Sequence, residues 1–215
     1  MPSTDPRYEL SDPRINAGES PYTFFLPSAA HIAAIAKGDH AKLIFEYPHP
    51  TEQWSAERMW VMIDTIDGDR LAGTLDNIPD EPTSTLQLGE AVQFERHHII
   101  AIDWANPEAA SPPAERRQYW DRCFVDACVL DGSEPVEYLY REAPESEEGD
   151  QDPDSGWRIR GRMGDATDEA IEAREAHYVA VGAVLNRDDS WLHLIDSPAG
   201  SAFMRDFETG AYVPQ

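Results

Sequence analysis

The stretch ANPEAASPPA at residues 105–114 constrains the fold most, because it separates two regions that each contain several strand-like segments. A segment this rich in Ala and Pro is typical of a connection between domains. The chain has 215 residues. That length is enough for one large domain or for two of about 100 residues each. We therefore predict two domains, at residues 1–107 and 108–215.

The first half predicts a small antiparallel sheet. A polar leader with four Pro covers residues 1–21, and Ser28 begins a short Ala-rich helix that we expect to end near Gly38. Apolar segments separated by turn residues follow, for example the DGD turn at residues 67–69. Strands are expected at residues 41–47, 59–66, 70–76, 91–96 and 97–104. Short strands with tight connections favour a strongly curved sheet.

The second half predicts another sheet with short helices. Helices are expected at residues 114–122 and 167–176, the latter beginning at Thr167. Strands are expected at residues 123–130, 136–142 and 154–161, while 177–185 fits a strand, a helix or one followed by the other. Val136, Tyr138 and Tyr140 are predicted to share one strand face. The predicted class is α+β, with two small domains that each carry a mostly antiparallel curved sheet and a few short helices.

The charge of the chain is strongly negative, with 41 acidic and 17 basic residues and a net charge of −24. Both halves contribute: residues before Pro107 carry −10 and the remainder carries −14. Such a surface repels nucleic-acid phosphates, which argues against direct DNA or RNA binding. It attracts a basic protein and speeds the encounter, although acidity also serves solubility alone.

The two cysteines, Cys123 and Cys128, lie five residues apart in a predicted strand. An odd spacing places them on opposite faces, which disfavours a shared metal site or a mutual disulfide. We expect two buried thiols in a reducing compartment. No apolar run approaches the roughly 18 residues that a membrane helix needs, and the N-terminus lacks the pattern of a secretory signal. The expected location is therefore the cytoplasm.

Several longer motifs resemble known bacterial families. In the first half, AERMWVMIDTIDGDRLAGTLDNIP and LQLGEAVQFERHHIIAIDW resemble the family called domain of unknown function 2314, over about residues 40–105. In the second half, CFVDACVLDGSEPVEYLYREAP, DSGWRIRG and VGAVLNRDDSWLHLIDSPAGSAFMRD resemble the immunity protein 33 family, over about residues 122–210. That second resemblance implies a protein that binds and silences a toxin delivered by neighbouring cells. Neither resemblance implies a set of catalytic residues.

A hydrolytic site in SWLHLIDSPAGSAFMRD is disfavoured. Nucleophilic Ser201 would need a base such as His193 within hydrogen-bond reach, and the residue two after Ser201 is Phe203 rather than the Gly of a hydrolase elbow. We predict instead a turn at residues 196–198, an unusual backbone angle at Gly200 and a core position for Phe203.

Metal and cofactor sites are not indicated either. His97 and His98 would point to opposite faces of a strand, with no further ligands at suitable spacing. The segment 142–154 holds seven acids and no base, and lacks the glutamate that closes a calcium loop after Gly156. We predict a solvated loop there. No glycine-rich phosphate motif is present, so no cofactor is expected.

A protein-binding surface is the remaining prediction. Trp and Arg are enriched among interface anchors, and here they stand beside Asp, which suits a basic target. Each Trp also fits a core position. The predicted partner-binding residues are Arg141, Asp154, Trp157, Asp188, Asp189, Trp191 and Arg205.

The leading hypothesis is a cytoplasmic immunity-type protein that neutralises a basic toxin, such as a nuclease, by contact and without chemistry of its own. Two alternatives remain open. One is a non-enzymatic accessory or regulatory module that binds another protein. The other is a hydrolase that uses Ser201 or a carboxylate pair.

Overall fold

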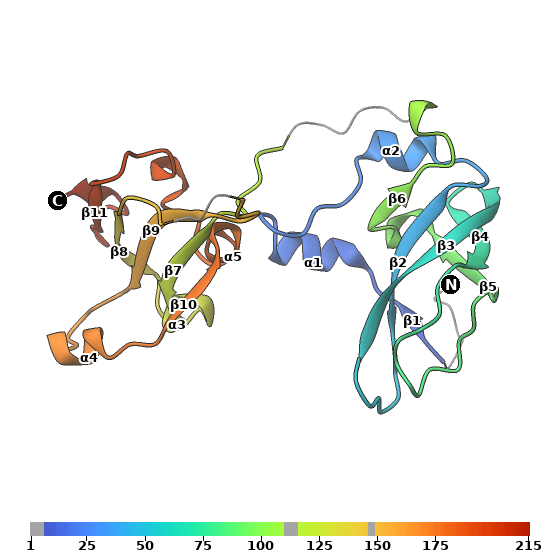
Figure 1. Ribbon diagram of the computed structural model, residues 1–215, viewed down its shortest axis with the longest axis horizontal. Coiled ribbons are helices and arrows are strands. Elements are labelled where there is room, and N and C mark those ends of the chain that lie inside the picture. Colours follow the sequence, from blue (N-terminus) through green and yellow to red (C-terminus); the bar gives the residue numbers. More distant parts are fainter. Residues whose placement is uncertain (1–6, 110–115, 146–148) are drawn as a thin grey trace. The chain divides into compact units, whose positions relative to one another are not determined.

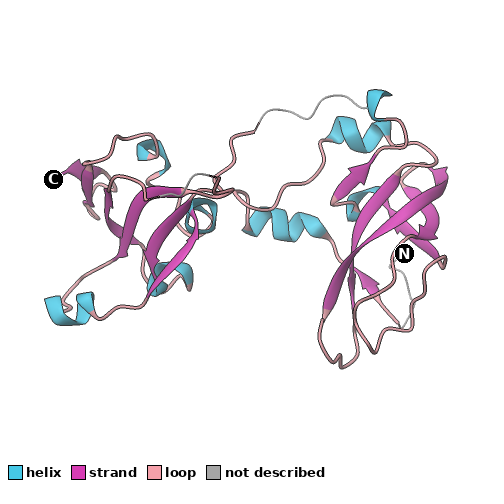
Figure 2. Ribbon diagram, in the orientation of Figure 1, coloured by secondary structure: helices cyan, strands magenta, loops and turns pink. Residues whose placement is uncertain are grey.

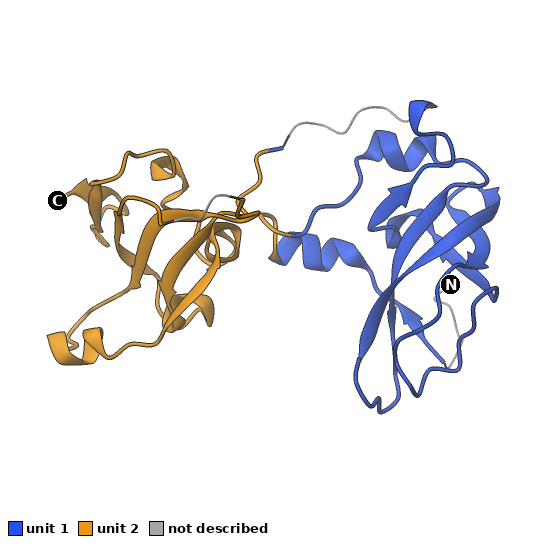
Figure 3. Ribbon diagram, in the orientation of Figure 1, with its two compact units in different colours: residues 1–19, 24–116 blue, residues 20–23, 117–215 orange. Residues whose placement is uncertain are grey.

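The computed structural model describes residues 7–109, 116–145 and 149–215 (Figure 1). The chain divides into two compact units (Figure 3). Unit 1 comprises Met1–Glu19 and Phe24–Arg116, and unit 2 comprises Ser20–Thr23 and Arg117–Gln215. Each unit holds a mostly antiparallel sheet with a few short helices, which confirms the predicted α+β class (Figure 2). The grouping differs from a single division at residue 107, because residues 20–23 lie with the second half of the chain.

Unit 1 contains a six-stranded sheet of order β1-β2-β3-β4-β5, with β6 paired to β2. Its strands are β1 (Glu9–Leu10), β2 (His40–Glu46), β3 (Ala56–Asp67), β4 (Arg70–Leu75), β5 (Ala91–Glu95) and β6 (Ala101–Asp103). Its helices are α1 (Pro13–Glu19), α2 (Ala29–Ala34), η1 (Arg96–His98) and η2 (Pro107–Ala109). Side chains from one face of β2, β3, β4 and β5 form the core, as the alternation of apolar residues in β4 and β5 predicts.

Two local predictions for unit 1 need correction. The Ser28 hydroxyl accepts the His31 backbone N–H as predicted, but the helix ends at Ala34, well before Gly38. The predicted strand 97–104 is shorter, because Arg96–His98 form a 3₁₀ turn. In that turn the Glu95 backbone N–H donates to Nδ1 of His98, and the two histidine rings lie 4.0 Å apart rather than on opposite strand faces.

A buried carboxylate organises the loop before β3. Glu81 is 2% exposed, and its oxygens accept backbone N–H groups from Glu52, Gln53, Trp54 and Thr83. Burial raises the pKa of Glu81, but the hydrogen bonds from Thr83 and the backbone outweigh it and hold the pKa well below its usual value. The ionised form therefore stabilises unit 1.

Replacement of Glu81 by Gln is expected to lower the melting temperature of unit 1 at pH 7. A carboxyl group with a lowered folded pKa contributes stability above its unfolded pKa and loses it as the pH falls. The difference from wild type should therefore shrink as the pH drops below 4.5, the ordinary value for this group. Thermal unfolding followed by circular dichroism at pH 7 and pH 3 measures this, with exposed Glu52→Gln as the control. An equal difference at both pH values would contradict it.

Unit 2 contains a six-stranded sheet of order β10-β7-β9-β8-β11-β12. Its strands are β7 (Arg122–Asp126), β8 (Val136–Arg141), β9 (Asp154–Gly161), β10 (Ala176–Ala180), β11 (Ala202–Arg205) and β12 (Tyr212–Pro214). Its helices are α3 (Ala127–Leu130), α4 (Asp168–Glu172), α5 (Val181–Leu185) and η3 (Leu192–Leu194). Among the described strands, β7 and β9 run parallel, and the other pairs are antiparallel.

The chain twice passes from a strand directly into a helix in unit 2. The predicted strand 123–130 is wrong in its second part, because the chain turns at Asp126 into α3. Segment 177–185 likewise forms β10 and then α5. Cys123 is therefore buried in the sheet while Cys128 lies on α3, and burial raises the pKa of the Cys123 thiol to about 12. The predicted helix 114–122 is absent from its described part, 116–122, since Arg122 already begins β7.

The segment Ser20–Thr23 is hydrogen-bonded into unit 2. The Tyr22 backbone N–H donates to Oδ1 of Asn186 at 2.9 Å, and Nδ2 of Asn186 donates to the Thr23 hydroxyl at 2.7 Å. A Cβ atom at Gly182 would lie 2.9 Å from the carbonyl oxygen of Tyr22. Glycine at this position of α5 thus permits the close approach of the segment.

Candidate functional site

The predicted anchors Trp157 and Trp191 are core residues. Both are fully buried, and their rings meet edge to face with centroids 5.5 Å apart. Nε1 of Trp157 donates to the carbonyl oxygen of Ile195. A side chain with no exposed surface cannot contact a partner while the unit is folded, so the prediction of a tryptophan anchor is corrected.

Asp188 and Arg205 form an internal ion pair. Nη1 of Arg205 lies 3.0 Å from Oδ2 of Asp188, which also accepts the backbone N–H of Val136. The Arg205 guanidinium lies against the rings of Phe207 and Tyr212. These two predicted contact residues therefore hold the end of the sheet together rather than face a partner.

Arg141 and Asp154 also act within the fold. Arg141 donates to the carbonyl oxygens of Ser155 and Ser197 at 2.9 and 2.6 Å. Asp154 is buried, and its carboxylate accepts hydrogen bonds from Nη1 and Nη2 of Arg158. Burial raises the pKa of Asp154, but the bonds from Arg158 and from backbone N–H groups outweigh it and lower that pKa.

Asp189 is the exposed member of the predicted set. Its carboxylate accepts the hydroxyl of Tyr22 at 2.7 Å, and this bond raises the pKa of Tyr22 to about 12. The structure thus does not gather the seven predicted residues on one surface.

A different surface of unit 2 combines exposed aromatic side chains with partly buried arginines. One face of the sheet is buried by α3, α5 and η3, and the other, here called the outer face, carries a row of residues in register across five strands. The row runs through Tyr178, Phe124, Arg158, Tyr140 and Ala202. β7, β9 and β10 lie side by side in Figure 1.

The β10–β7 side of the outer face presents an exposed aromatic pair. Phe124 and Tyr178 are 43% and 44% exposed, and their ring centroids lie 4.8 Å apart. The Arg158 guanidinium lies 5.0 Å from the Phe124 ring. Folding normally buries such large aromatic side chains, and exposed clusters of them are typical of protein-binding surfaces.

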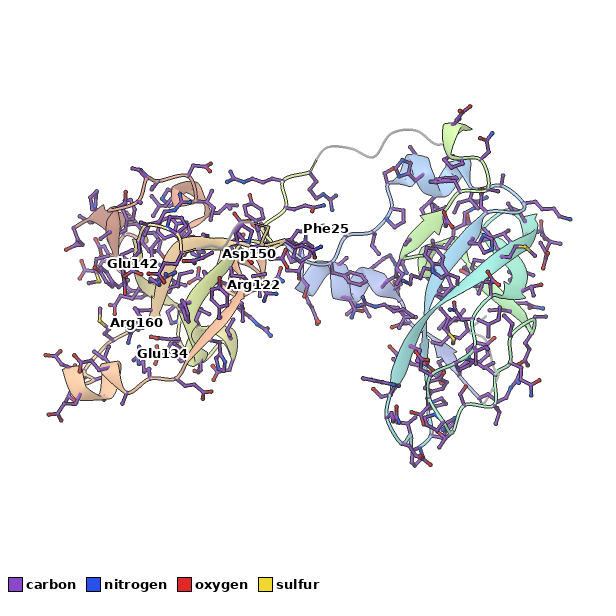
Figure 4. The ribbon with its side chains drawn as sticks, viewed as in Figure 1. Phe25, Arg122, Glu134, Glu142, Asp150 and Arg160 are labelled. Atoms are coloured by element: carbon purple, nitrogen blue, oxygen red, sulfur yellow. The ribbon has the colours of Figure 1, made fainter. Side chains whose placement is uncertain are left out.

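A second row lies beside the first, and it includes Arg160, Tyr138 and Met204. Arg160, labelled in Figure 4, bonds to the carboxylate of Asp126 at 2.9 Å and donates to the Ile171 carbonyl oxygen at 2.6 Å. Asp126 is 1% exposed and also pairs with Arg174 at 3.3 Å. This buried carboxylate fixes the positions of two arginines at one end of the outer face.

The arginines of the outer face are neutralised within the unit. Arg158 pairs with Asp154 at 3.0 Å and with Glu142 at 2.8 Å, and its side chain is 12% exposed. Arg160 pairs with Asp126. These arginines therefore add no unpaired positive charge to the outer face.

The sequence pattern already indicated part of the outer face. Phe124 lies between buried Cys123 and Val125, so alternation in β7 already assigns it to the opposite face. The predicted shared face of Val136, Tyr138 and Tyr140 is wrong in one member. The pairing of β8 with β9 shifts register between Val136 and Tyr138, so Val136 is buried while both tyrosines are on the outer face.

The candidate hydrolytic residues Ser201 and His193 lie on different structural elements. The predicted turn before Ser201 is present, with Gly200 at a φ of 91° and Phe203 packed partly buried against the core. His193 lies on η3 with its ring 6.1 Å from that of Tyr212. The backbone N–H of Ser201 donates to the Pro198 carbonyl oxygen at 3.2 Å. Within residues 7–109, 116–145 and 149–215, no three His, Cys, Asp or Glu side chains form a metal-binding group.

The outer face and the core beneath it coincide with a family domain. Residues 123–214 match the Immunity protein Imm33 domain. Residues 20–111 match DUF2314, described as an uncharacterized protein conserved in bacteria. Both resemblances found in the sequence are thereby confirmed. No curated protein and no solved structure matches the chain.

The Imm33 match covers every residue of the outer-face row, and it indicates an immunity-type function with a protein partner. The described residues include no helix that is both long enough and apolar enough to span a membrane.

Proposed function

We propose that this protein is a cytoplasmic immunity protein that binds a toxin and neutralises it by contact, with the outer face of unit 2 as the contact surface. The observation that carries the proposal is the match of residues 123–214 to the Imm33 domain. The proposal involves no catalysis by this protein, because binding to the toxin is itself what neutralises it.

The exposed pair Phe124 and Tyr178 supplies the anchor that Trp157 and Trp191, being buried, cannot supply. Aromatic side chains that lose their hydration at the centre of an interface dominate binding energies. The net charge of −14 on the second half favours a basic toxin, because complementary charge steers the encounter. Asp189 is exposed, and in the acidic segment 142–154, of which residues 146–148 lie outside the described residues, Glu145, Asp150 and Asp152 are exposed as well and add to that charge. Asp154 at the end of that segment is buried in β9 and does not.

The test pairs this protein with the product of the adjacent gene. Co-purification and rescue from toxicity on co-expression are expected. A protein that neither binds nor protects against any neighbouring toxin would overturn the proposal.

The combined change Phe124→Ser and Tyr178→Ser is expected to weaken toxin binding by about 30-fold or more, since truncating anchor residues costs about 2 kcal/mol or more. Calorimetric titration measures the affinity, and circular dichroism verifies the fold. The matched control is Trp54→Ser with Ile78→Ser, two exposed apolar side chains of unit 1 at 53% and 75% exposure. Unchanged affinity in the first double variant would remove the outer face as the contact surface.

A further inference from the structure

A groove of about 600 Å³ lies where β8 and β11 meet on the outer face. Here it is called the tyrosine groove, and its argued members are Tyr138, Tyr140, Glu142, Glu145 and Ser201. It lies within the Imm33 match and on the same row as the Phe124–Tyr178 pair.

The walls of the tyrosine groove are held by backbone bonds. The N–H of Gly200 donates to the Arg141 carbonyl oxygen at 2.7 Å, and the N–H of Arg141 donates to the Ser201 carbonyl oxygen at 2.9 Å. On the other side, the Glu145 N–H donates to the Asp154 carboxylate at 3.2 Å. The groove is therefore formed before any ligand arrives, which lowers the entropic cost of binding.

Two aromatic rings line the tyrosine groove. Tyr138 and Tyr140 are half-buried, with ring centroids 5.5 Å apart and planes inclined by 31°. The face of a tyrosine ring carries negative electrostatic potential and attracts cations within about 6 Å of its centre.

The rim of the tyrosine groove is acidic. The Glu142 side chain, labelled in Figure 4, is 52% exposed and pairs on one side with Nε of Arg158 at 2.8 Å, and Glu145 is exposed as well. Arg141 also lines the groove, but its guanidinium lies 5.6 Å from the ring of buried Trp157 and donates to the carbonyl oxygens of Ser155 and Ser197. Aromatic rings and carboxylates that line one groove form the environment that a guanidinium or ammonium group prefers.

We propose that the tyrosine groove binds the basic side chain of an arginine or lysine presented by the protein partner. The assignment rests on the proposed function for the identity of that partner, and it names the chemistry that the partner inserts. The aromatic pair Phe124–Tyr178 would then anchor the interface while the groove selects a cation at its other end.

The test uses the full chain and a synthetic peptide, acetyl-Gly-Arg-Gly-amide, followed by nuclear magnetic resonance. Saturable shifts are expected at residues 138–145 and 200–202, together with the ring signals of Tyr138 and Tyr140. The same peptide with citrulline, which is the neutral isostere of arginine, should bind at least about tenfold more weakly because its side chain carries no charge.

The combined change Glu142→Gln and Glu145→Gln is expected to weaken binding of the arginine peptide about tenfold, as the loss of two partly exposed charge contacts implies. Asp165→Asn with Glu172→Gln is the matched control, since both residues are exposed and neither lines the groove. Equal shifts for the arginine and citrulline peptides, or shifts unaffected by the groove variant, would overturn the assignment.

The two proposals fail separately. A protein that protects against its toxin but does not distinguish arginine from citrulline overturns the groove assignment alone. A protein that binds the arginine peptide as expected but protects against no neighbouring toxin overturns the proposed function alone.

Discussion

Replacement of Trp157 by alanine is expected to lower the free energy of unfolding of unit 2 by about 4 kcal/mol, the range for a large aromatic residue removed from a packed core. Trp157 is fully buried, contacts Trp191 edge to face and lies beneath the Arg141 guanidinium. Its loss leaves a cavity and also removes the donor to the Ile195 carbonyl oxygen.

Urea unfolding followed by circular dichroism measures this change, because the signal does not depend on the tryptophan itself. Trp120→Ala is the matched control, since Trp120 is 37% exposed. That control should change the stability of unit 2 far less. A loss below about 1 kcal/mol for Trp157→Ala, the size typical of surface changes, would contradict the core position.

Replacement of Asp126 by alanine is expected to destabilise unit 2 by about 3 kcal/mol, because it leaves two largely buried cations without their carboxylate. Arg160 and Arg174 both pair with Asp126, and their side chains are 29% and 20% exposed. Asp126 also accepts the backbone N–H of Gly161 at 3.1 Å.

The comparison for Asp126→Ala is Asp196→Ala, which breaks the exposed pair between Asp196 and Arg117. Exposed pairs contribute about 0–1 kcal/mol. Urea unfolding of both variants should therefore separate them clearly. Similar losses in the two variants would show that the burial of Asp126 has no energetic consequence.

Much of the fold could be predicted from local pattern. Alternating apolar residues and glycine turns predicted β2 to β5 of unit 1 but not β1, which lies in the polar leader. The hydroxyl residues Ser28 and Thr167 predicted two helix starts that the structure confirms. The wrong predictions concern segments whose structure depends on contacts with residues distant in the sequence. The segment 123–130 is apolar except for Asp126, so its pattern suits a strand, yet the chain turns at Asp126 into α3.

The candidate site was harder to predict, because a residue type does not reveal its burial. Trp191 stands beside charged Asp188 and Asp189, which suggested exposure, but Asp188 turns inward to accept the N–H of Val136. The useful signal was the outward position of Phe124 in its strand. Its partner Tyr178 becomes its neighbour only through the pairing of β7 with β10, which no local window of sequence contains.

Unit 2 is discontinuous in sequence, and this has a consequence for cutting the chain into pieces. A fragment that begins at Arg117 contains all of residues 123–214 but lacks Tyr22 and Thr23, the bonding partners of Asn186 and Asp189. Supplied as a free peptide, those residues would have to associate from dilute solution. Within the intact chain they are covalently tethered, so their association with the rest of unit 2 is intramolecular. The N-terminal half of the chain thus supplies residues 20–23, which belong structurally to unit 2.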